Sequence, residues 1–560
     1  MRIGVLTEGG YPYASSESRV WCDRLVRGLA QHEFDVYALS RSAGTRGGGG
    51  PFRQPANVRL VRTAPLWAPA DDGRTYGRRD RRRFTTHLAD LVTALSRTPQ
   101  AAGGTGDDPL AARFASGLYG LADLARERGG LCAALRSESA ARVLEAACRA
   151  PGAHRSVHPA TVPDYLAFAD RLERALRPLS LDWYDTADGL GSTDLCHAAS
   201  SGAAALPGLV AKRFFGVPLL VTEYGVQLRA HYLTAAGTPD SPPLRTLLAA
   251  FQRRLTTEVY RQADALTPGN THARRWQERC GADRARIRTV YPGVEAERFA
   301  AVGDRADEGG AGDGRTVVWV GRVEPAKDLV GLLHAFGEIR KQLPHTRLRI
   351  IAAPVRDREA GGYLAHCRGL AAQLFPDEAA GAHAVGDNPV SFEEIGGPEA
   401  PDLADAYAAG SVSVLSSVVE GFPVGLIEAM LCGRATVSTD VGAVVEVIGG
   451  TGLVVPPRNP RALADACLAL LRDPERRQRL GAAARARALE LFTVEQNLAA
   501  FRALYLELLA LAPVRRETES PYGWPVPFAH PAEAHVAGRW TAAPRPAPAW
   551  AATVAEGVHV

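Results

Sequence analysis

The sequence predicts an α/β protein with two Rossmann-like domains. Short runs of aliphatic and β-branched residues alternate with amphipathic segments of helical length, which is typical of parallel sheets covered by helices. The 560 residues exceed what one hydrophobic core organises. Residues 300–315 are rich in Asp, Gly and Ala without an apolar period and are expected to form a linker. The first domain is therefore predicted over residues 1–299 and the second over residues 316–490.

The composition is that of a globular protein without a nucleic-acid partner. Hydrophobic residues make up 46% of the chain, and the formal net charge of +4 is too small to indicate nucleic acid as the main partner. The eight cysteines lack CxxC spacing, so free thiols are expected, and no zinc or redox motif. The apolar core of residues 2–7 is too short for a signal peptide, and no run of 18 apolar residues occurs. These observations predict a cytoplasmic protein.

The first domain opens on a strand, a helix and a strand, as Rossmann-like folds do. Further along, His197 ends one expected strand and Tyr224 follows another. Strand ends face ligands in doubly wound sheets, so both are candidate site residues, although a structural role explains His197 equally well. The expected strands are residues 3–6, 34–39, 193–197, 218–222, 263–268 and 287–290, and the expected helices are residues 19–30, 200–215, 244–262 and 271–280.

An Ala-, Leu- and Arg-rich region over about residues 78–178 interrupts the strand pattern and predicts a helical insertion in the first domain. It begins with a basic run over residues 78–83, which we interpret as a solvated helix face rather than a contact with an anionic lipid or polysaccharide. The helices expected here are residues 84–95, 110–128 and 140–150.

The second domain returns to the alternation of strands and helices. A capping-box pattern at Thr493 and Gln496 precedes a final helix within residues 491–512. Residues 513–560 are rich in Pro and Ala and are expected to lack a fold of their own. The expected strands are residues 317–320, 347–352, 412–415, 436–438 and 453–455.

Two strand–turn–helix units of the second domain carry the residues that predict its chemistry. After the first strand, Arg322 and Lys327 precede Asp328, a predicted helix N-cap. After the strand at 412–415, Glu420 lies in a turn and Glu428 lies on the helix that follows. Cations and a helix N-terminus bind phosphates, while carboxylates bind hydroxyl groups. A nucleotide sugar would satisfy both sets, although the carboxylates could instead be simple partners of the helix dipole.

These residues resemble the signature of retaining GT-B glycosyltransferases of the GT4 group. The matching motifs are Glu420-x7-Glu428 with Gly421-Phe422-Pro423, and Gly321-Arg322-Val-x-Pro325-x-Lys327-Asp328. The beginning of the chain is similar to the Pel exopolysaccharide glycosyltransferase (DUF3492) branch, through Leu6-Thr-Glu8-Gly-Gly-Tyr11-Pro12-Tyr13 and Trp21-Cys22. The resemblance implies two Rossmann-like domains facing a cleft, with a last helix that crosses back to the first domain.

The resemblance also implies a role for each motif residue. Arg322 and Lys327 would stabilise the diphosphate leaving group, Glu420 would bind the transferred sugar, and Glu428 would bind the ribose. The remaining donor contacts would be Gly321, Gly421, Phe422, Pro423, Val424 and Gly425, with the N–H groups of Val424 and Gly425 facing the diphosphate. No metal and no cofactor are expected beyond the substrate, a nucleotide sugar for which UDP-glucose or a related UDP-hexose is the default.

The first domain departs from the family pattern. Ser16 and Glu17 stand where relatives usually carry a Gly-Gly pair, and Glu17 is interpreted equally well as an acceptor contact or as a solvated carboxylate. Tyr224 stands where a histidine usually contacts the donor sugar, and we favour Tyr224 over His231 as the sugar-facing group.

The predicted function is the transfer of a hexose to a glycan, polysaccharide or small-molecule acceptor. A peripheral contact with a membrane-bound polysaccharide synthase at the inner membrane face is compatible with this assignment. Two alternatives stay open: a nucleotide-sugar-binding subunit without turnover, which the departures in the first domain motivate, and a sugar epimerase on the same fold.

Overall fold

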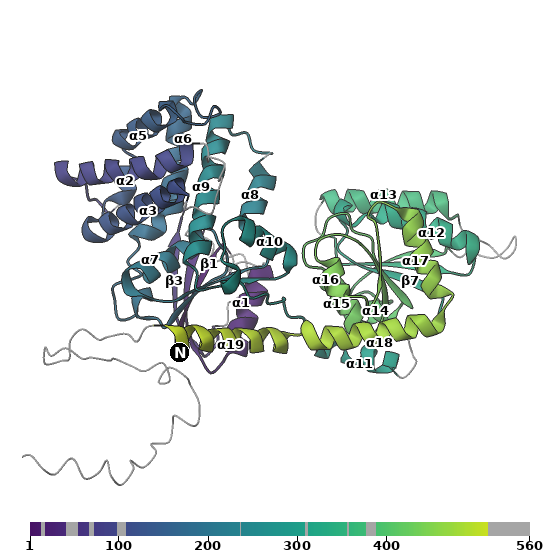
Figure 1. The fold of residues 1–560 in the computed structure, drawn as a ribbon. Helices are drawn as coiled ribbons and strands as arrows, with labels where there is room; N and C mark the ends of the chain where they lie inside the picture. Colours follow the sequence, from purple (N-terminus) through teal and green to yellow (C-terminus); the bar gives the residue numbers. More distant parts are fainter. Residues whose placement is uncertain are drawn as a thin grey trace, which may run out of the picture. The chain divides into compact units, whose positions relative to one another are not determined.

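The protein is described by a computed structural model that covers residues 1–9, 11–12, 17–40, 54–66, 72–97, 108–235, 237–307, 312–355, 358–376 and 388–512. Two compact units are seen in Figure 1, each built around a six-stranded parallel sheet. The first unit comprises Met1–Pro268, Trp276–Arg288 and the described residues from Phe501 onward, and the second comprises Gly269–Arg275 and Thr289–Ala500. The predicted α/β class with two Rossmann-like domains is confirmed.

The sheet of the first unit has the strand order β3-β2-β1-β4-β5-β6, and every neighbouring pair is parallel. Its central strands are nearly continuous hydrophobic runs, as expected for a sheet buried on both faces. The edge strand β3 was not expected from the sequence, because its arginines interrupt the apolar pattern and its residues are only partly buried. The strands are β1 (Arg2–Glu8), β2 (Glu33–Ser40), β3 (Val58–Pro65), β4 (Leu195–Ala198), β5 (Leu219–Glu223) and β6 (Ala265–Pro268).

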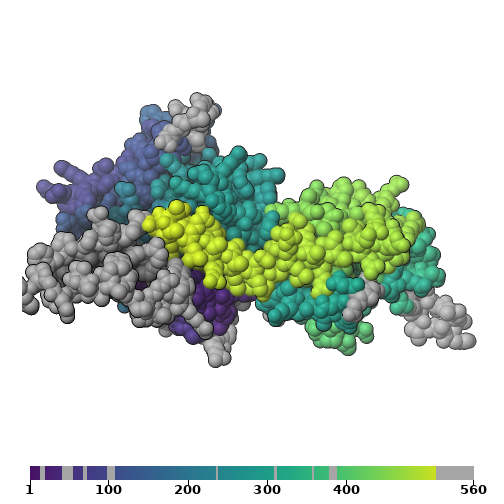
Figure 2. Space-filling model, turned by 60° about the horizontal axis from the view of Figure 1, so that its bottom comes forward, coloured from purple at the N-terminus to yellow at the C-terminus, as the bar shows by residue number. Residues whose placement is uncertain are grey.

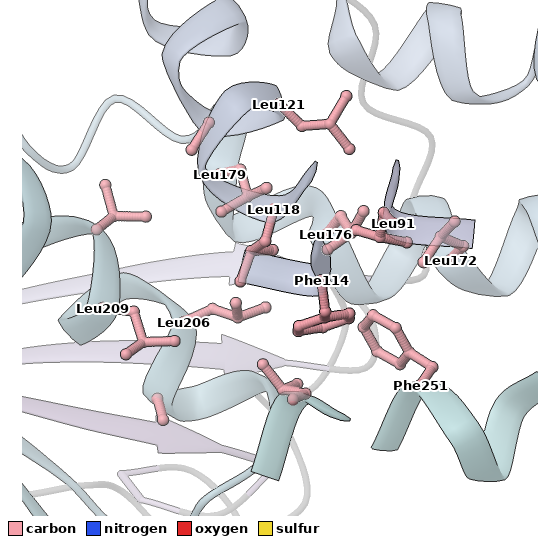
Figure 3. Close-up of a cluster of buried hydrophobic side chains, with 14 of the residues drawn as sticks. Leu91, Phe114, Leu118, Leu121, Leu172, Leu176, Leu179, Leu206, Leu209 and Phe251 are labelled. Carbon is pink, nitrogen blue, oxygen red and sulfur yellow. The ribbon is translucent and has the colours of Figure 1, made fainter. Parts of the chain in front are cut away.

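The expected helical insertion is present and shares one core with the sheet. Figure 3 shows Phe114 and leucines of the insertion gathered with Leu206, Leu209 and Phe251 from later helices. The insertion consists of α2 (Arg78–Ser96), α3 (Pro109–Arg128), α4 (Leu131–Leu135), α5 (Glu138–Arg149), α6 (Val162–Leu176) and the 3-10 turn η2 (Arg177–Ser180). The other helices that contribute to this unit are α1 (Glu17–Gly28), α7 (Leu206–Phe215), α8 (Gln227–Ala235), α9 (Pro242–Gln262) and α10 (Thr271–Arg279).

One close contact lies within the insertion, and a second contact joins the insertion to the sheet. Gly120 on α3 packs against α2 so tightly that an added Cβ would lie 2.2 Å from the ring of His87. Arg177 is fully buried beside Glu173, with Nη2 and Oε2 2.8 Å apart, and it donates to the carbonyl oxygen of Pro65 at the end of β3. A buried guanidinium needs such partners because charge burial is otherwise costly. The insertion is therefore an integral part of the first unit.

The sheet of the second unit has the order β12-β11-β10-β7-β8-β9, again with parallel neighbours. The strand β9 was missed because its short sequence, Val-Ser-Phe-Glu-Glu, has little apolar character. The strands are β7 (Thr316–Gly321), β8 (Arg347–Ala352), β9 (Val390–Glu394), β10 (Val412–Leu415), β11 (Ala435–Thr439) and β12 (Leu453–Val455). The helices are α11 (Glu297–Asp307), α12 (Leu329–Gln342), α13 (Arg358–Leu374), α14 (Leu403–Ala408), α15 (Val424–Leu431), α16 (Val444–Ile448), α17 (Pro460–Leu471) and α18 (Pro474–Leu491), of which α18 lies on the surface of this unit (Figure 2).

The prediction of a linker over residues 300–315 is wrong for residues 300–307, which belong to α11. Phe299, Val302 and Ala306 form a buried stripe on this helix, and Phe299 and Val302 pack into a core of the second unit. The Asp, Gly and Ala content concealed this period. The second unit accordingly resumes at Thr289, before the predicted boundary. The strand expected at residues 287–290 is reduced to one bridge, between Leu266 and Ile287.

The last described helix, α19 (Val494–Leu511), contributes to both units, and the division falls between residues 500 and 501. In the first unit, Phe501 packs against Trp21 with ring centroids 5.7 Å apart. Tyr505 is buried and bonds to His197. The expected tail over residues 513–560 lies outside the described residues.

Candidate functional site

The two predicted motifs of the second unit meet at one edge of its sheet. β7 and β10 are parallel neighbours, with Val317 paired to Val412. Their carboxyl ends therefore lie at the same edge, where open α/β sheets bind ligands. Gly321 ends β7, and the turn of residues 420–423, the site turn, follows β10. Lys327 and Glu420, which are 93 residues apart in sequence, are thereby brought into contact.

Lys327 and Glu420 form an ion pair, with Nζ and Oε2 2.6 Å apart. Their side chains are 17% and 15% exposed, so the pair is largely shielded from water. Ser417 donates from Oγ to the same carboxylate oxygen at 3.1 Å. Ser416 donates to the backbone carbonyl of Lys327 at 2.7 Å, which ties the two motif loops together. The sequence motifs did not predict that the cation and the carboxylate hold each other.

The lysine itself is unusual in this chain, which has only three lysines among its 65 basic residues. Lys212 pairs with Asp264 and Lys341 pairs with Glu338, both as ion pairs of about the same length as the Lys327 pair. An ammonium group offers three N–H donors on a compact charge. Among the described residues, Glu420 is the hydrogen-bond acceptor for Lys327 Nζ, so this ammonium keeps donor capacity for an anionic ligand.

Arg322 lies just after the same strand and is 70% exposed. Its Nε is 3.5 Å from Glu324 Oε1. An exposed pair of this kind contributes only about 0–1 kcal/mol. Asp328 caps α12 as predicted, accepting from the N–H of Gly331 at 3.0 Å with a backbone φ of 48°.

The helix α15 begins directly after the site turn, with Pro423 at the N-cap position rather than within the first turn. The N–H of Val424 donates to the carbonyl oxygen of Phe422 at 3.0 Å, so one of the two predicted phosphate donors is engaged within the turn. The N–H of Gly425 has no acceptor among the described residues. The helix start thus presents one backbone donor together with the positive end of its dipole.

The segment after β11 braces the site turn from the other side. The N–H of Ala443 donates to the carbonyl oxygen of Gly421 at 3.1 Å. Gly442 has a φ of +56°, and an added Cβ there would lie 2.3 Å from the carbonyl oxygen of Glu420. Only glycine satisfies both the backbone conformation and this close approach.

Glu446 and Tyr291 support the site turn, and neither was among the predicted site residues. The Phe422 ring stacks against Tyr291, with centroids 6.1 Å apart and an interplanar angle of 20°. The Tyr291 hydroxyl donates to Glu446 at 2.9 Å, and the N–H of Thr271 donates to the other carboxylate oxygen at 2.8 Å. Burial, with Glu446 second, raises the pKa of Tyr291 to about 12, so the phenol stays a donor. The sequence signal that could have pointed to Glu446 is a carboxylate in the first turn of a short helix, α16.

Glu428 is half-buried and lies one turn into α15. The hydroxyl of Tyr407, on α14, donates to Glu428 Oε2 at 2.9 Å. Tyr407 is itself buried, and this burial raises the pKa of its phenol well above the usual value. The carboxylate is therefore held by a neutral donor from a neighbouring helix.

Among the described candidate residues of the first unit, His197 is engaged within the fold. His197 is buried, and its two ring nitrogens lie 2.7 Å from the Tyr505 hydroxyl and 2.7 Å from Thr222 Oγ1. Burial lowers the pKa of His197 to about 3, so the ring is neutral, and both nitrogens are engaged within the fold. This arrangement favours the structural interpretation of His197 over ligand contact.

Tyr224 is half-buried, and its ring meets the edge of Trp21 at a centroid distance of 5.5 Å. His231, the other candidate for the sugar-facing group, is half-buried on α8, and burial lowers its pKa. Ser16 and the side chain of Glu17 lie outside the described residues.

Glu223 is a buried carboxylate that the sequence did not bring forward. It ends β5, directly before Tyr224, and accepts from Ser201 Oγ at 2.6 Å, from the N–H of Gln227 at 2.9 Å and from the hydroxyl of Tyr260. These donors compensate the loss of hydration. Glu223 therefore anchors the turn that carries Tyr224.

The eight cysteines are free thiols, as expected. No group of His, Cys, Asp and Glu side chains that could hold a metal ion occurs among the described residues. Across the same part of the chain, every helix is too short or too polar to cross a membrane.

Residues 1–285 match the family described as a domain of unknown function, DUF3492, and residues 314–473 match the family described as glycosyl transferases group 1. The chain is 30% identical over 307 residues to the D-inositol 3-phosphate glycosyltransferase of Kribbella flavida, covering 53% of this chain and 68% of the relative. The Frankia alni protein of the same name is 32% identical over 307 residues, covering 52% and 68%.

Two solved structures share the fold. Sucrose-phosphate synthase from Thermosynechococcus elongatus has a TM-score of 0.51 at 18% identity and covers 91% of this chain and 99% of its own. Anabaena HepE in complex with UDP has a TM-score of 0.50 at 13% identity and covers 90% and 99%. The expected GT-B fold is confirmed by these likenesses and by the two parallel sheets.

Proposed function

This chain belongs to the group 1 glycosyltransferases, and we propose that it is a retaining, metal-independent transferase of the GT4 type. It moves a hexose from a nucleotide diphosphate sugar, by default UDP-glucose or a related UDP-hexose, to a hydroxyl group of a glycan, polysaccharide or small molecule. The observation that carries this assignment is the shielded pair of Lys327 and Glu420 beside the start of α15. Cation, carboxylate and helix terminus lie at one sheet edge, as the diphosphate and the hydroxyl groups of such a donor require.

The chemistry demands stabilisation of the leaving group. When the bond between the anomeric carbon and the phosphate oxygen breaks, the electron pair stays on the nucleotide diphosphate. We assign Lys327, Arg322 and the N–H of Gly425 to this developing charge. The acceptor oxygen forms the new bond to the anomeric carbon, and its proton passes to the departing phosphate oxygen on the same face.

Glu420 serves two purposes in this proposal. In the structure it holds the Lys327 ammonium at 2.6 Å, which fixes the direction of the cation before a ligand binds. When the donor binds, Glu420 also accepts from the hydroxyl groups of the transferred sugar. A same-face route needs no protein nucleophile, and the carboxylate of Glu223 in the first unit is buried and already bound by four donors.

The test is the thermal stability of the purified protein against UDP, GDP, ADP and their sugars, with a chelator present. A ligand that binds the native state raises the melting temperature by mass action, so stabilisation by one nucleotide family identifies the donor base. Retention of stabilisation under chelation supports metal independence. If none of these ligands shifts the melting temperature, the assignment of this sheet edge to a nucleotide sugar fails.

A second function has a specific observation in its favour. A tyrosine hydroxyl does not accept and release a proton near neutral pH as the usual histidine does, and Tyr224 follows an anchored strand end in the first unit. This favours a nucleotide-sugar-binding subunit of a polysaccharide synthase complex, peripheral at the inner membrane face, within the Pel-like branch. Tight nucleotide binding without transfer, together with capture of a membrane synthase, would support the subunit. Release of nucleotide upon addition of an acceptor would support the transferase.

A further inference from the structure

Tyr407 and Glu428 are in direct contact. The Tyr407 hydroxyl lies 2.9 Å from Glu428 Oε2, and the tyrosine ring is buried against Phe299, with centroids 6.3 Å apart in an edge-to-face arrangement. The phenol comes from α14, whereas the carboxylate lies on α15. The direction of the carboxylate is thus set from outside its own helix.

The backbone makes room for this contact. Gly425 and Glu428 are three residues apart on α15 and therefore lie on the same face of the helix. An added Cβ at Gly425 would lie 3.1 Å from the Tyr407 oxygen, which is tighter than ordinary contact. The glycine at this position lets the phenol pass over the first turn and reach the carboxylate.

The hydrogen bond has one direction. Burial, with the nearby Glu428 second, raises the pKa of Tyr407 well above its usual value, so the phenol remains protonated at any physiological pH. It therefore donates, and Glu428 Oε2 accepts. Anchoring one oxygen of a carboxylate restricts rotation about its terminal torsion, which is otherwise broad.

We propose that Tyr407 is a positioning residue for nucleotide recognition, because it fixes Glu428 in the orientation that binds the two ribose hydroxyl groups. This inference rests on the proposed function, in which Glu428 contacts the ribose. Preorganisation of this kind raises affinity by removing the cost of ordering the side chain on binding. The consequence is selectivity: the contribution of Tyr407 is expressed for ribonucleotides and vanishes for a nucleotide without the two hydroxyl groups.

The experiment measures dissociation constants by calorimetry for UDP and for its 2′,3′-dideoxy analogue, or for the corresponding pair if another base is found to bind. Tyr407→Phe should weaken binding of the ribonucleotide about tenfold and change binding of the dideoxy analogue less than about twofold. The matched control is Tyr363→Phe, which removes a phenol of the same unit that accepts from the N–H of Leu329 at 3.0 Å. This control should leave both constants unchanged.

A double-mutant cycle separates positioning from independent action. If Tyr407 acts through Glu428, the Tyr407→Phe change should have no further effect in a Glu428→Ala background. Equal weakening of both nucleotides by Tyr407→Phe would overturn the inference and leave the phenol as a packing group. If Glu428→Ala itself leaves ribonucleotide binding unchanged, the ribose assignment of the proposed function fails instead. Weakening by Glu428→Ala without weakening by Tyr407→Phe refutes this inference alone.

Discussion

Replacement of Lys327 by alanine tests the central pair of the site. The change removes the cation and leaves Glu420 with Ser417 as its remaining described side-chain donor. Loss of one partner costs about 3–5 kcal/mol for a buried pair, whereas a whole exposed pair is worth about 0–1 kcal/mol. With side chains 17% and 15% exposed, the Lys327 pair lies between these limits, and we expect a loss of about 2 kcal/mol in the free energy of unfolding. For a domain of this size the melting temperature should fall by about 4–8 °C.

The effect on ligand binding should be selective for the diphosphate. Lys327→Ala should weaken UDP binding about tenfold, because a charge-assisted hydrogen bond is lost, and should change UMP binding much less. Turnover should fall about 100- to 1,000-fold, the usual effect of removing one preorganised donor to a developing negative charge. Calorimetry gives the two affinities, and nucleotide release in the presence of hydroxyl acceptors gives the turnover.

The matched control is Lys341→Ala, because Lys341 forms an exposed pair with Glu338 on the same unit. This variant should unfold within about 0.5 kcal/mol of the wild type and should bind both nucleotides normally. If Lys327→Ala bound UDP as tightly as Lys341→Ala does, and UMP likewise, the placement of Lys327 at the diphosphate would be refuted, whatever the stabilities of the two variants.

Three further predictions concern other parts of the molecule. Gly442→Ala should abolish the nucleotide-induced rise in melting temperature, because its Cβ would displace the site turn, whereas Gly450→Ala has a φ of +90° with open space around it and should only destabilise modestly. Burial lowers the pKa of His197 from 6.5 to about 3, so between these pH values the unfolded state binds a proton that the folded state does not. The free energy of unfolding should therefore be highest above pH 6.5 and fall by up to about 1.4 kcal/mol per pH unit as the pH decreases. Calorimetry should find a smaller slope in His197→Gln. In the insertion, Gly120→Ala should lower the melting temperature of the first unit without changing nucleotide binding. The control is Gly369→Ala in α13 of the second unit, which should not destabilise because no atom lies near its added Cβ. A stable Gly120 variant would contradict the close packing of α2 and α3.

The second domain was more readable from sequence than the first, for a physical reason. Its ligand motifs are local: Gly321 to Asp328 and Glu420 to Glu428 each combine a strand end, a turn and a helix start within a few residues. Such units can be predicted from the type and order of their residues alone. The mutual contact of Lys327 and Glu420 was not readable, because it depends on β7 and β10 being sheet neighbours.

The supporting residues lie at still larger separations. Glu446 meets Tyr291 across 155 positions, and Tyr407 reaches Glu428 from a different helix. Periodicity gives no information about such pairs, since either side chain alone looks like an ordinary buried tyrosine or surface carboxylate. The helix α11 was missed for a different reason, because its small and acidic residues outnumber the buried stripe that defines it.

The bond between His197 and Tyr505 has a consequence for the order of synthesis. The two residues are 308 positions apart, and the whole second unit is made between them. At a translation rate of 5–20 residues per second, the histidine waits roughly 15 to 60 seconds for its partner after leaving the ribosome. The first unit is therefore completed only after the second unit has been synthesised, and a nascent chain that stalls before residue 505 leaves His197 without its Tyr505 partner.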